Sequence, residues 1–310
     1  MEFQVGYPHR IVTGWPEYTG PQWIMDLARI AGDLGFWAFH VGDHLAVLKQ
    51  HDAIPTPNWF DPASFLAWMT TETKMTPVIN VYVMPYRSPF HTAKQVATLD
   101  VVTGGRAIMA AGVGYLKTEF DQLGIPWETR GPMTDDYIRA MKALWTQDEA
   151  TYDGEFVKFK EMRFWPKPIR KPHPPVWIGG QTKLSLYRAA SLGDGWNPFM
   201  FDLQGMKDAI GYLESYWSQK DTRERPENFQ VVFGAQAKVT DSKITDNERQ
   251  HFHGTPDQIL LDVEEYVEHG ITFCSLGFEG TTWPVYHENM ERFAREVMPK
   301  AKDIGPGAPY

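Results

Sequence analysis

The chain has 310 residues and a formal net charge of -9, an acidic balance that disfavours nucleic acid or an anionic membrane surface as a general partner. No Pro-, Gly- or Ser-rich stretch and no strongly charged linker divides it, so we expect one domain over residues 1–310. Cys274 is the single cysteine, which excludes an intramolecular disulfide framework and a cysteine-based metal cluster. We expect it to be a core residue in a protein of a reducing cytoplasm.

The N-terminal stretch MEFQVGYPHRIVTGWPEY carries no signal-like apolar region, because Glu2, His9, Arg10 and prolines interrupt it. No later segment is long and apolar enough to span a bilayer. The sequence therefore predicts a soluble protein located in the cytoplasm.

Short apolar runs alternate with longer helical patterns along almost the whole chain, which is typical of βα units around a parallel sheet. Strands are predicted at 3–6, 36–42, 77–83, 107–113, 175–180, 195–199, 229–239 and 271–278. Helices are predicted at 21–34, 62–74, 90–103, 131–147, 182–192, 203–219, 256–269 and 284–297. Eight such units in a chain of this length predict an α/β fold, a (β/α)8 TIM barrel.

Local signals mark the ends of several elements. Thr255-Pro256-Asp257-Gln258 has the pattern of a capping box, and the glycines at 104, 105 and 270 are suited to left-handed helix ends. Two connections are longer than usual for this fold. The segment 148–174 predicts a hairpin that turns at Asp153-Gly154, and 239–255 predicts a polar, mobile loop.

The second predicted strand ends in HVGDHLAV, which brings His40, Asp43 and His44 close together. Functional residues of a TIM barrel lie at the carboxyl ends of its strands. His44 follows the strand in the mouth loop, where an imidazole can bind or polarise a substrate near neutral pH. Metal binding, or a turn capped by Asp43 with His44 packed in place, are the alternatives. We favour an active-site role for His44.

The third and fourth strands end in VMPYRSPF and GVGYLKTEFDQLG. Pro85 cannot continue a strand ladder, which predicts a bent backbone at the end of the third strand. The fourth strand lacks the third glycine of a dinucleotide-binding fingerprint, so Rossmann-type binding is excluded. Gly112 and its neighbours leave space for a planar ring with Tyr115 at its edge, and a tight turn with Tyr115 packed into the loop is the alternative.

The fifth strand runs into Gly179-Gly180 and then a helix, in the stretch PPVWIGGQTKLSLYRAASLGDGW. Bare backbone beside a helix N-terminus favours an anion such as a phosphate, although the two glycines could equally serve a tight turn with positive φ. His251 and His253 form an H-x-H pair, but they lie in a polar loop before a helix cap. That position argues against a metal site, and we predict none.

Three stretches together resemble the bacterial luciferase-like oxidoreductases. They are PYRSPFHTAKQVATLDVVTGGRAIMAAGVGYLKTEFDQLGIPWETRGPMTDDYIRAMKALW, then PKPIRKPHPPVWIGGQTKLSLYRAASLGDGW, then GTPDQI. The resemblance covers nearly the whole chain, and it implies a (β/α)8 barrel, a homodimer, and FMN or the deazaflavin coenzyme F420 as cofactor. The run from Gly112 to Gly131 most resembles the F420-dependent branch.

The resemblance also implies roles for particular residues. Gly179, Gly180 and Gln181 match the loop that holds the cofactor phosphate, and the bend at Val83-Met84 is similar to the family's bulge behind the flavin-type ring, which often carries a non-proline cis peptide. The resemblance also places Val113 and Tyr115 near the ring or its ribityl chain, with Gly112 beside them as a cofactor-binding residue. Asp43 and His44 match the pair that lies near the reacting face.

One departure bears on the direction of the reaction. Many relatives have Trp at the position of Tyr115, and sugar-phosphate dehydrogenases of the F420 branch have an acidic residue near it. That proton-relay glutamate is absent here, which disfavours alcohol oxidation and favours hydride donation from reduced F420 to a small, electron-poor substrate. Alternatives are an FMN-dependent monooxygenase fed by a separate reductase, and a flavin-binding protein without catalysis.

Overall fold

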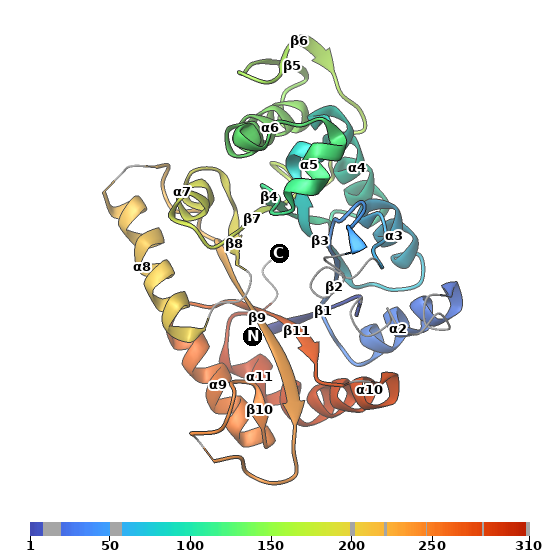
Figure 1. Cartoon of the computed structure of the whole chain (residues 1–310), viewed down its shortest axis with the longest axis vertical. Coiled ribbons are helices and arrows are strands. Elements are labelled where there is room, and N and C mark those ends of the chain that lie inside the picture. Colours follow the sequence, from blue (N-terminus) through green and yellow to red (C-terminus); the bar gives the residue numbers. More distant parts are fainter. Residues whose placement is uncertain are drawn as a thin grey trace.

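The computed structural model describes residues 1–8, 20–49, 58–198, 202–219, 222–245, 247–280 and 282–307. Within these ranges eight parallel strands form the wall of a barrel, and helices surround it (Figure 1). Neighbouring strands are β9 (Gln230–Val239), β11 (Phe273–Phe278), β1 (Glu2–Gly6), β2 (Ala38–Val41), β3 (Thr76–Val83), β4 (Ile108–Gly112), β7 (Val176–Gly179) and β8 (Gly195–Asn197). Pairing of β8 with β9 closes the barrel, as the sequence predicted.

Helices follow the strands and cover the outside of the barrel. They are α2 (Pro21–Asp33), α3 (Pro62–Met69), α4 (Pro89–Val102), α5 (Lys117–Leu123), α6 (Arg130–Thr146), α7 (Lys183–Leu192), α8 (Leu203–Ser218), α9 (Pro256–Glu268), α10 (Trp283–Arg292) and α11 (Met298–Ile304). Three short helical turns are η3 (Met84–Tyr86), η4 (Trp127–Thr129) and η5 (Phe293–Val297). The two-residue strand β10 (His253–Gly254) pairs with the end of β9.

The segment predicted as a hairpin forms β5 (Glu149–Asp153) and β6 (Lys158–Arg163), which project beyond α6 (Figure 1). Asp136 of α6 anchors the turn, because its carboxylate accepts hydrogen bonds from Tyr152 Oη and from the backbone N–H groups of Phe156 and Val157. The hairpin is therefore tied to the barrel by a helix and not only by its two ends.

Two separate apolar cores follow from the alternation of side chains along each strand. One side faces the helices and belongs to the large core, which includes Phe3 and Val5 of β1. The other side faces the barrel interior, where a smaller cluster forms an apolar floor: Ala38, Val78, Ile108, Ala110, Trp177, Val232 and Phe273. Functional groups must lie above this floor, toward the carboxyl ends of the strands.

Local predictions are mostly confirmed. Thr255 and Gln258 form the capping box at the start of α9, the glycines at 104, 105 and 270 have positive φ, and Cys274 is buried. The helix predicted over 62–74 ends earlier, at Met69, and the sequence analysis did not identify α5 or α11. Among the described residues, no helix is long and apolar enough to cross a membrane.

Candidate active site

Glycines occupy many of the inward positions at the carboxyl ends of the barrel strands. TIM barrels are ordinarily filled by layers of inward side chains, so glycine here removes a layer. Most of these positions are covered by a side chain from a neighbouring segment: a Cβ on Gly6 would meet His40, on Gly42 Trp59, on Gly112 or Gly179 Val81, and on Gly277 Gln236. Gly234 differs, because it is exposed and a Cβ there would meet no atom of the described part of the chain within 4 Å.

One half of the inner wall is built around an irregularity in β3. The register between β3 and β4 shifts between Asn80 and Tyr82, and the Asn80–Val81 peptide bond is cis. Val81 extends across the positions where Gly112 and Gly179 lack side chains, 2.5 and 3.0 Å from where their Cβ atoms would be. We call Asn80, Val81, Gly112, Gly179 and Asn197 the bulge wall. Within this wall, Asn197 Nδ2 donates a 2.6 Å hydrogen bond to Asn80 Oδ1.

The bulge was predicted at Val83-Met84, but the register shift lies earlier in β3, between Asn80 and Tyr82. Val83 packs with Tyr86 and Phe120, and Met84 is buried in the outer core at the start of η3. Their side chains therefore do not occupy the bulge wall, and Val81 stands in that position. Pro85 predicted the bend and the family resemblance implied the bulge, but Pro85 marks the end of the strand and not the register shift inside it.

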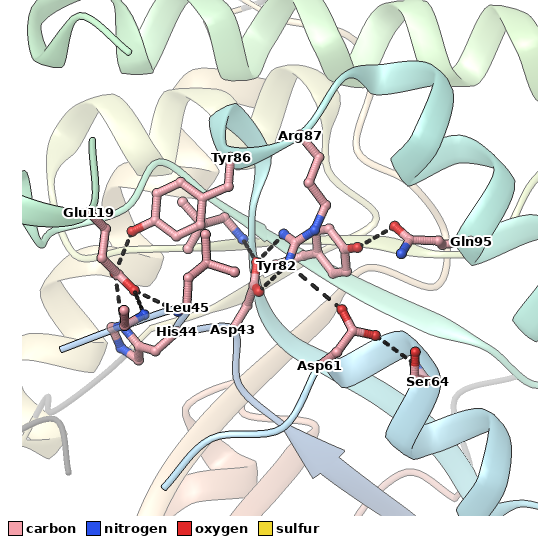
Figure 2. Close-up of polar contacts among 12 residues, drawn as sticks. Asp43, His44, Leu45, Asp61, Ser64, Tyr82, Tyr86, Arg87, Gln95 and Glu119 are labelled. Carbon is pink, nitrogen blue, oxygen red and sulfur yellow. Dashed lines mark hydrogen bonds and ion pairs between the residues drawn. The ribbon is translucent and has the colours of Figure 1, made fainter. Parts of the chain in front are cut away.

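Asp43 is part of a buried clamp below the mouth (Figure 2). Its carboxylate accepts hydrogen bonds of 2.8 and 2.7 Å from the Arg87 guanidinium and one of 2.9 Å from the Val83 N–H group. Arg87 also packs over the Tyr82 ring. With its side chain only 1% exposed and both oxygens bonded to Arg87, Asp43 fixes the end of β3. This geometry does not support the direct catalytic role predicted for Asp43.

His44 stands in a hydrogen-bonded row at the mouth. Its Nδ1 lies 3.0 Å from Glu119 Oε2, and its Nε2 lies 3.0 Å from Tyr115 Oη. The imidazole also packs against Trp59. Tyr115 is 62% exposed, so the row runs from a buried carboxylate to a phenol at the protein surface.

Glu119 is held as a carboxylate by the donors around it (Figure 2). Oε2 accepts a 2.6 Å hydrogen bond from Tyr86 Oη, and Oε1 accepts one of 2.6 Å from the Leu45 N–H group. Burial by itself raises the pKa of Glu119, but hydrogen bonds from His44, Tyr86 and the Leu45 backbone outweigh it and lower that pKa. Burial and the neighbouring carboxylate raise the pKa of Tyr86, which therefore stays a donor. His44 thus keeps its proton on Nδ1, and Nε2 faces Tyr115.

Glu119 was not among the predicted site residues. Position 115 holds a tyrosine and no acidic residue, yet the fold brings the carboxylate of Glu119, one helical turn further along, to His44. Glu119 lies in the first turn of α5, directly before the buried Phe120. The signal in the sequence was a glutamate next to an apolar residue in a short helix. Because α5 was not predicted, Glu119 was not recognised as a buried residue.

The Gly179-Gly180 loop has features of a tight turn and also features of a phosphate-binding loop. Gly180 has φ +118°, so a turn that favours glycine is present. Thr182 caps α7 by accepting a hydrogen bond from Ser185 N–H, and the preceding residue Gln181 is exposed. The first N–H groups of α7, from Lys183 and Leu184, have no partner within the helix and suit an anion. The loop fits a phosphate by its donor chemistry.

The H-x-H pair has surroundings of its own. His251 lies 3.7 Å from Asp262 and packs on Tyr266, while Arg249 binds the same carboxylate through two hydrogen bonds. Asp262 also accepts the Phe252 N–H, so these contacts fasten the predicted polar loop to α9.

The fold is a closed parallel (β/α)8 barrel with a register shift in its third strand and a histidine shortly after its second strand. Residues 1–251 match the family described as luciferase-like monooxygenase. The chain belongs to this family, whose members are flavin- or F420-dependent oxidoreductases or monooxygenases.

Individual relatives differ in what they do. An uncharacterized protein of Mycobacterium tuberculosis is 30% identical over 259 residues, covering 78% of this chain and 90% of the relative. The FMNH(2)-dependent dimethylsulfone monooxygenase of Pseudomonas putida is 35% identical over 126 residues, 40% of this chain and 35% of that enzyme. The 5,10-methylenetetrahydromethanopterin reductase of Archaeoglobus fulgidus is 31% identical over 168 residues, 54% of this chain and 46% of that enzyme.

Solved structures share the fold. The monooxygenase RslO1 of Streptomyces bottropensis superposes with a TM-score of 0.77 at 18% identity, covering 97% of this chain and 99% of that one. The coenzyme F420-dependent tetrahydromethanopterin reductase of Methanopyrus kandleri gives 0.75 at 18% identity, with the same coverage. The fold prediction is confirmed, and both kinds of cofactor occur among the neighbours.

Proposed function

We propose that this protein is an F420-dependent oxidoreductase that reduces a small, electron-poor substrate. The observation that carries the proposal is the row Glu119–His44–Tyr115 at the barrel mouth. Addition of a hydride to a C=C or C=N bond leaves negative charge on the second atom, which must receive a proton. A hydrogen-bonded row ending in an exposed phenol is suited to deliver that proton.

Each member of the row has a distinct task in this proposal. Tyr115 Oη gives its proton to the substrate atom that becomes negative, and it takes a replacement proton from a His44 that carries one on Nε2 as well as on Nδ1. Glu119 accepts the Nδ1–H hydrogen bond and so fixes the tautomer that leaves Nε2 facing Tyr115. When bound, reduced F420 supplies the hydride, and the cofactor itself is oxidised.

The residues present fit such a cofactor in two places. The loop at Gly179, Gly180 and Gln181 would hold its phosphate at the start of α7, and the bulge wall with Val113 would lie behind its ring. A phosphate site fits both F420 and FMN, so it does not distinguish them. The resemblance of residues 112–131 to the F420 branch, together with the reductase of Archaeoglobus fulgidus among the relatives, favours F420.

An FMN-dependent monooxygenase is the second candidate. The 35% identity over 126 residues with the dimethylsulfone monooxygenase supports it. In either case we expect a homodimer acting on a small molecule, with a separate reductase that supplies the reduced cofactor.

The test combines binding with turnover. Purified apo-protein is titrated with F420 and with FMN, and oxidation of reduced F420 is then followed without oxygen against activated alkenes, imines and nitroaromatics. We expect F420 binding and anaerobic turnover, with His44→Ala and Tyr115→Phe each lowering turnover about 10²-fold while cofactor affinity changes little. Tight FMN binding with oxygen-dependent product, and no measurable F420 binding, would overturn the assignment.

A further inference from the structure

The barrel wall opposite the bulge carries polar side chains laid across glycines. The His40 ring lies over Gly6 of β1 and reaches Ser275 of β11, with 3.2 Å between Nε2 and Oγ. The side chain of Gln236 lies over Gly277 in the same way. We call this half of the interior the polar wall: Gln4, Gly6, His40, Gly234, Gln236, Ser275 and Gly277.

Gln4 forms the base of the polar wall. It is in register with Ser275 on one neighbouring strand and with Ala38 of the apolar floor on the other, so its side chain faces the barrel interior. It is fully buried, and neither its Oε1 nor its Nε2 has a hydrogen-bond partner among the residues that the structure describes. Buried amides are nearly always paired, so this donor and acceptor need a partner in the working protein.

Room for a ligand lies directly beside these groups. Gly234 of β9 is in register with Ser275 and is exposed, and no atom of the described residues lies within 4 Å of its Cβ position. His40 and Ser275 are themselves partly exposed. Solvent therefore reaches the level of the His40–Ser275 pair, and the buried Gln4 lies in register beside Ser275.

The charge of the wall limits what can bind. Among the described residues that face the interior above the floor, up to the level of Gly277, there is no Asp, Glu, Lys or Arg, and His40 is the ionisable group. An anion or cation placed here would lose its hydration without gaining a counter-ion. Neutral hydrogen-bonding groups suffer no such penalty.

We propose that the polar wall binds the hydrogen-bonding group of a small uncharged substrate, such as a carboxamide or a ketone. Ser275 and His40 contact that group, and Gln4 compensates whichever of the two gives up its present hydrogen bond. The inference rests on the proposed function, because it assigns the substrate side of the same mouth. It excludes phosphorylated or carboxylated groups from this wall.

The test uses three probes of one shape: benzamide, acetophenone and benzoate. Their dissociation constants are measured by ligand-observed NMR at about pH 8. The proteins are the wild type, Ser275→Ala, Gly234→Val and the control Gly211→Val, whose Cβ position on α8 is also open. Circular dichroism checks that each variant is folded, and F420 and FMN titrations are run in parallel.

We expect both neutral probes to bind and benzoate to bind at least about tenfold more weakly than benzamide. Ser275→Ala and Gly234→Val should each raise the dissociation constant of benzamide about fivefold or more, while Gly211→Val leaves it unchanged. Benzoate binding as tightly as benzamide, an unchanged constant in Ser275→Ala or Gly234→Val, or no saturable binding of either neutral probe would overturn the inference. Probe binding requires no turnover, so failure of the F420 assignment would appear separately, in the cofactor titrations.

Discussion

The bulge wall and the polar wall are built in the same way but present different side chains, apolar in the first and hydrogen-bonding in the second. In both, a glycine on one strand makes room for a side chain from a neighbouring strand. On the bulge wall the occupant is Val81, which covers Gly112 and Gly179 and presents an apolar surface. On the polar wall the occupants are His40 and Gln236, which present hydrogen-bonding groups.

The two walls also differ in how firmly they are held. The bulge wall is fastened by Asn197 to Asn80 and by Asp43 to the end of β3, both through short hydrogen bonds. The polar wall has the His40–Ser275 contact, and among the described residues the Gln4 amide is unpaired and the Cβ position of Gly234 is open. An apolar wall opposite a wall with unpaired hydrogen-bonding groups is the arrangement expected of a small-molecule site, in which apolar surface holds the ligand and a few polar groups orient it.

Breaking the clamp should produce the largest change, and it should affect the bulge wall. Asp43→Ala leaves the Arg87 guanidinium without its main partner and Val83 N–H without an acceptor, so we expect a loss of about 3 kcal/mol in the free energy of unfolding. Urea denaturation measures it. The control is Asp26→Ala, which removes an exposed 3.1 Å ion pair with Arg29 and should cost less than about 0.5 kcal/mol.

A double variant separates the causes. Asp43→Ala with Arg87→Met removes the unpaired charge as well, so it should recover part of the lost stability. Equal stability of Asp43→Ala and Asp26→Ala would show that the clamp does not hold the wall. In folded Asp43→Ala, benzamide binding should persist, since the polar wall does not depend on this ion pair.

Glu119 lies outside both walls, so substituting it shows whether the row Glu119–His44–Tyr115 is independent of them. Glu119→Gln places an NH2 group against donors, so we expect a cost of about 2 kcal/mol and a shift of the His44 proton from Nδ1 to Nε2. Nitrogen NMR of the imidazole reports the tautomer. An unchanged tautomer would contradict the positioning role.

The same variant has a defined pH dependence. The pKa of Glu119 is lowered in the folded state, so its stabilisation is present above its ordinary value of 4.5 and is lost as pH falls through the lower folded pKa. The difference in unfolding free energy between wild type and Glu119→Gln should be constant from about pH 6 to pH 8 and shrink below about pH 4.5. A difference that grows toward acid pH would be inconsistent with an ionised Glu119.

Matched glycine substitutions compare the walls directly. A Cβ on Gly112 would lie 2.5 Å from Val81 Cγ1, so Gly112→Ala should cost about 1–3 kcal/mol through overpacking. Gly234→Ala meets open space and should be neutral or stabilising by up to about 1 kcal/mol. Thermal unfolding of the pair measures the contrast, and equal effects would mean that the two glycines are not used differently.

Sequence reasoning located the strands because apolar runs and helical patterns are local signals. The bulge left no such signal, since Asn80-Val81-Tyr82 contains neither Gly nor Pro and has the pattern of an ordinary strand. The His40–Ser275 contact joins residues 235 positions apart, which no local pattern can reveal. Glu119 was missed because its helix was missed. What could be predicted was the order of elements, and what could not was which side chains the barrel brings together.

Gly180 is a third kind of glycine, and the effect expected from substituting it is a change in cofactor affinity. Its φ of +118° and the 2.9 Å distance from its Cβ position to Ser185 Cβ penalise any side chain, so Gly180→Ala measures the conformational cost. Gly180→Asp adds a negative charge beside the predicted phosphate site at the start of α7. If a phosphate binds there, Gly180→Asp should weaken cofactor affinity about tenfold beyond Gly180→Ala, or about 1.4 kcal/mol. Fluorescence titration of both variants measures this ratio, which cancels the shared backbone strain. Equal affinities in the two variants would mean that Gly179 and Gly180 form a turn and take no part in anion binding.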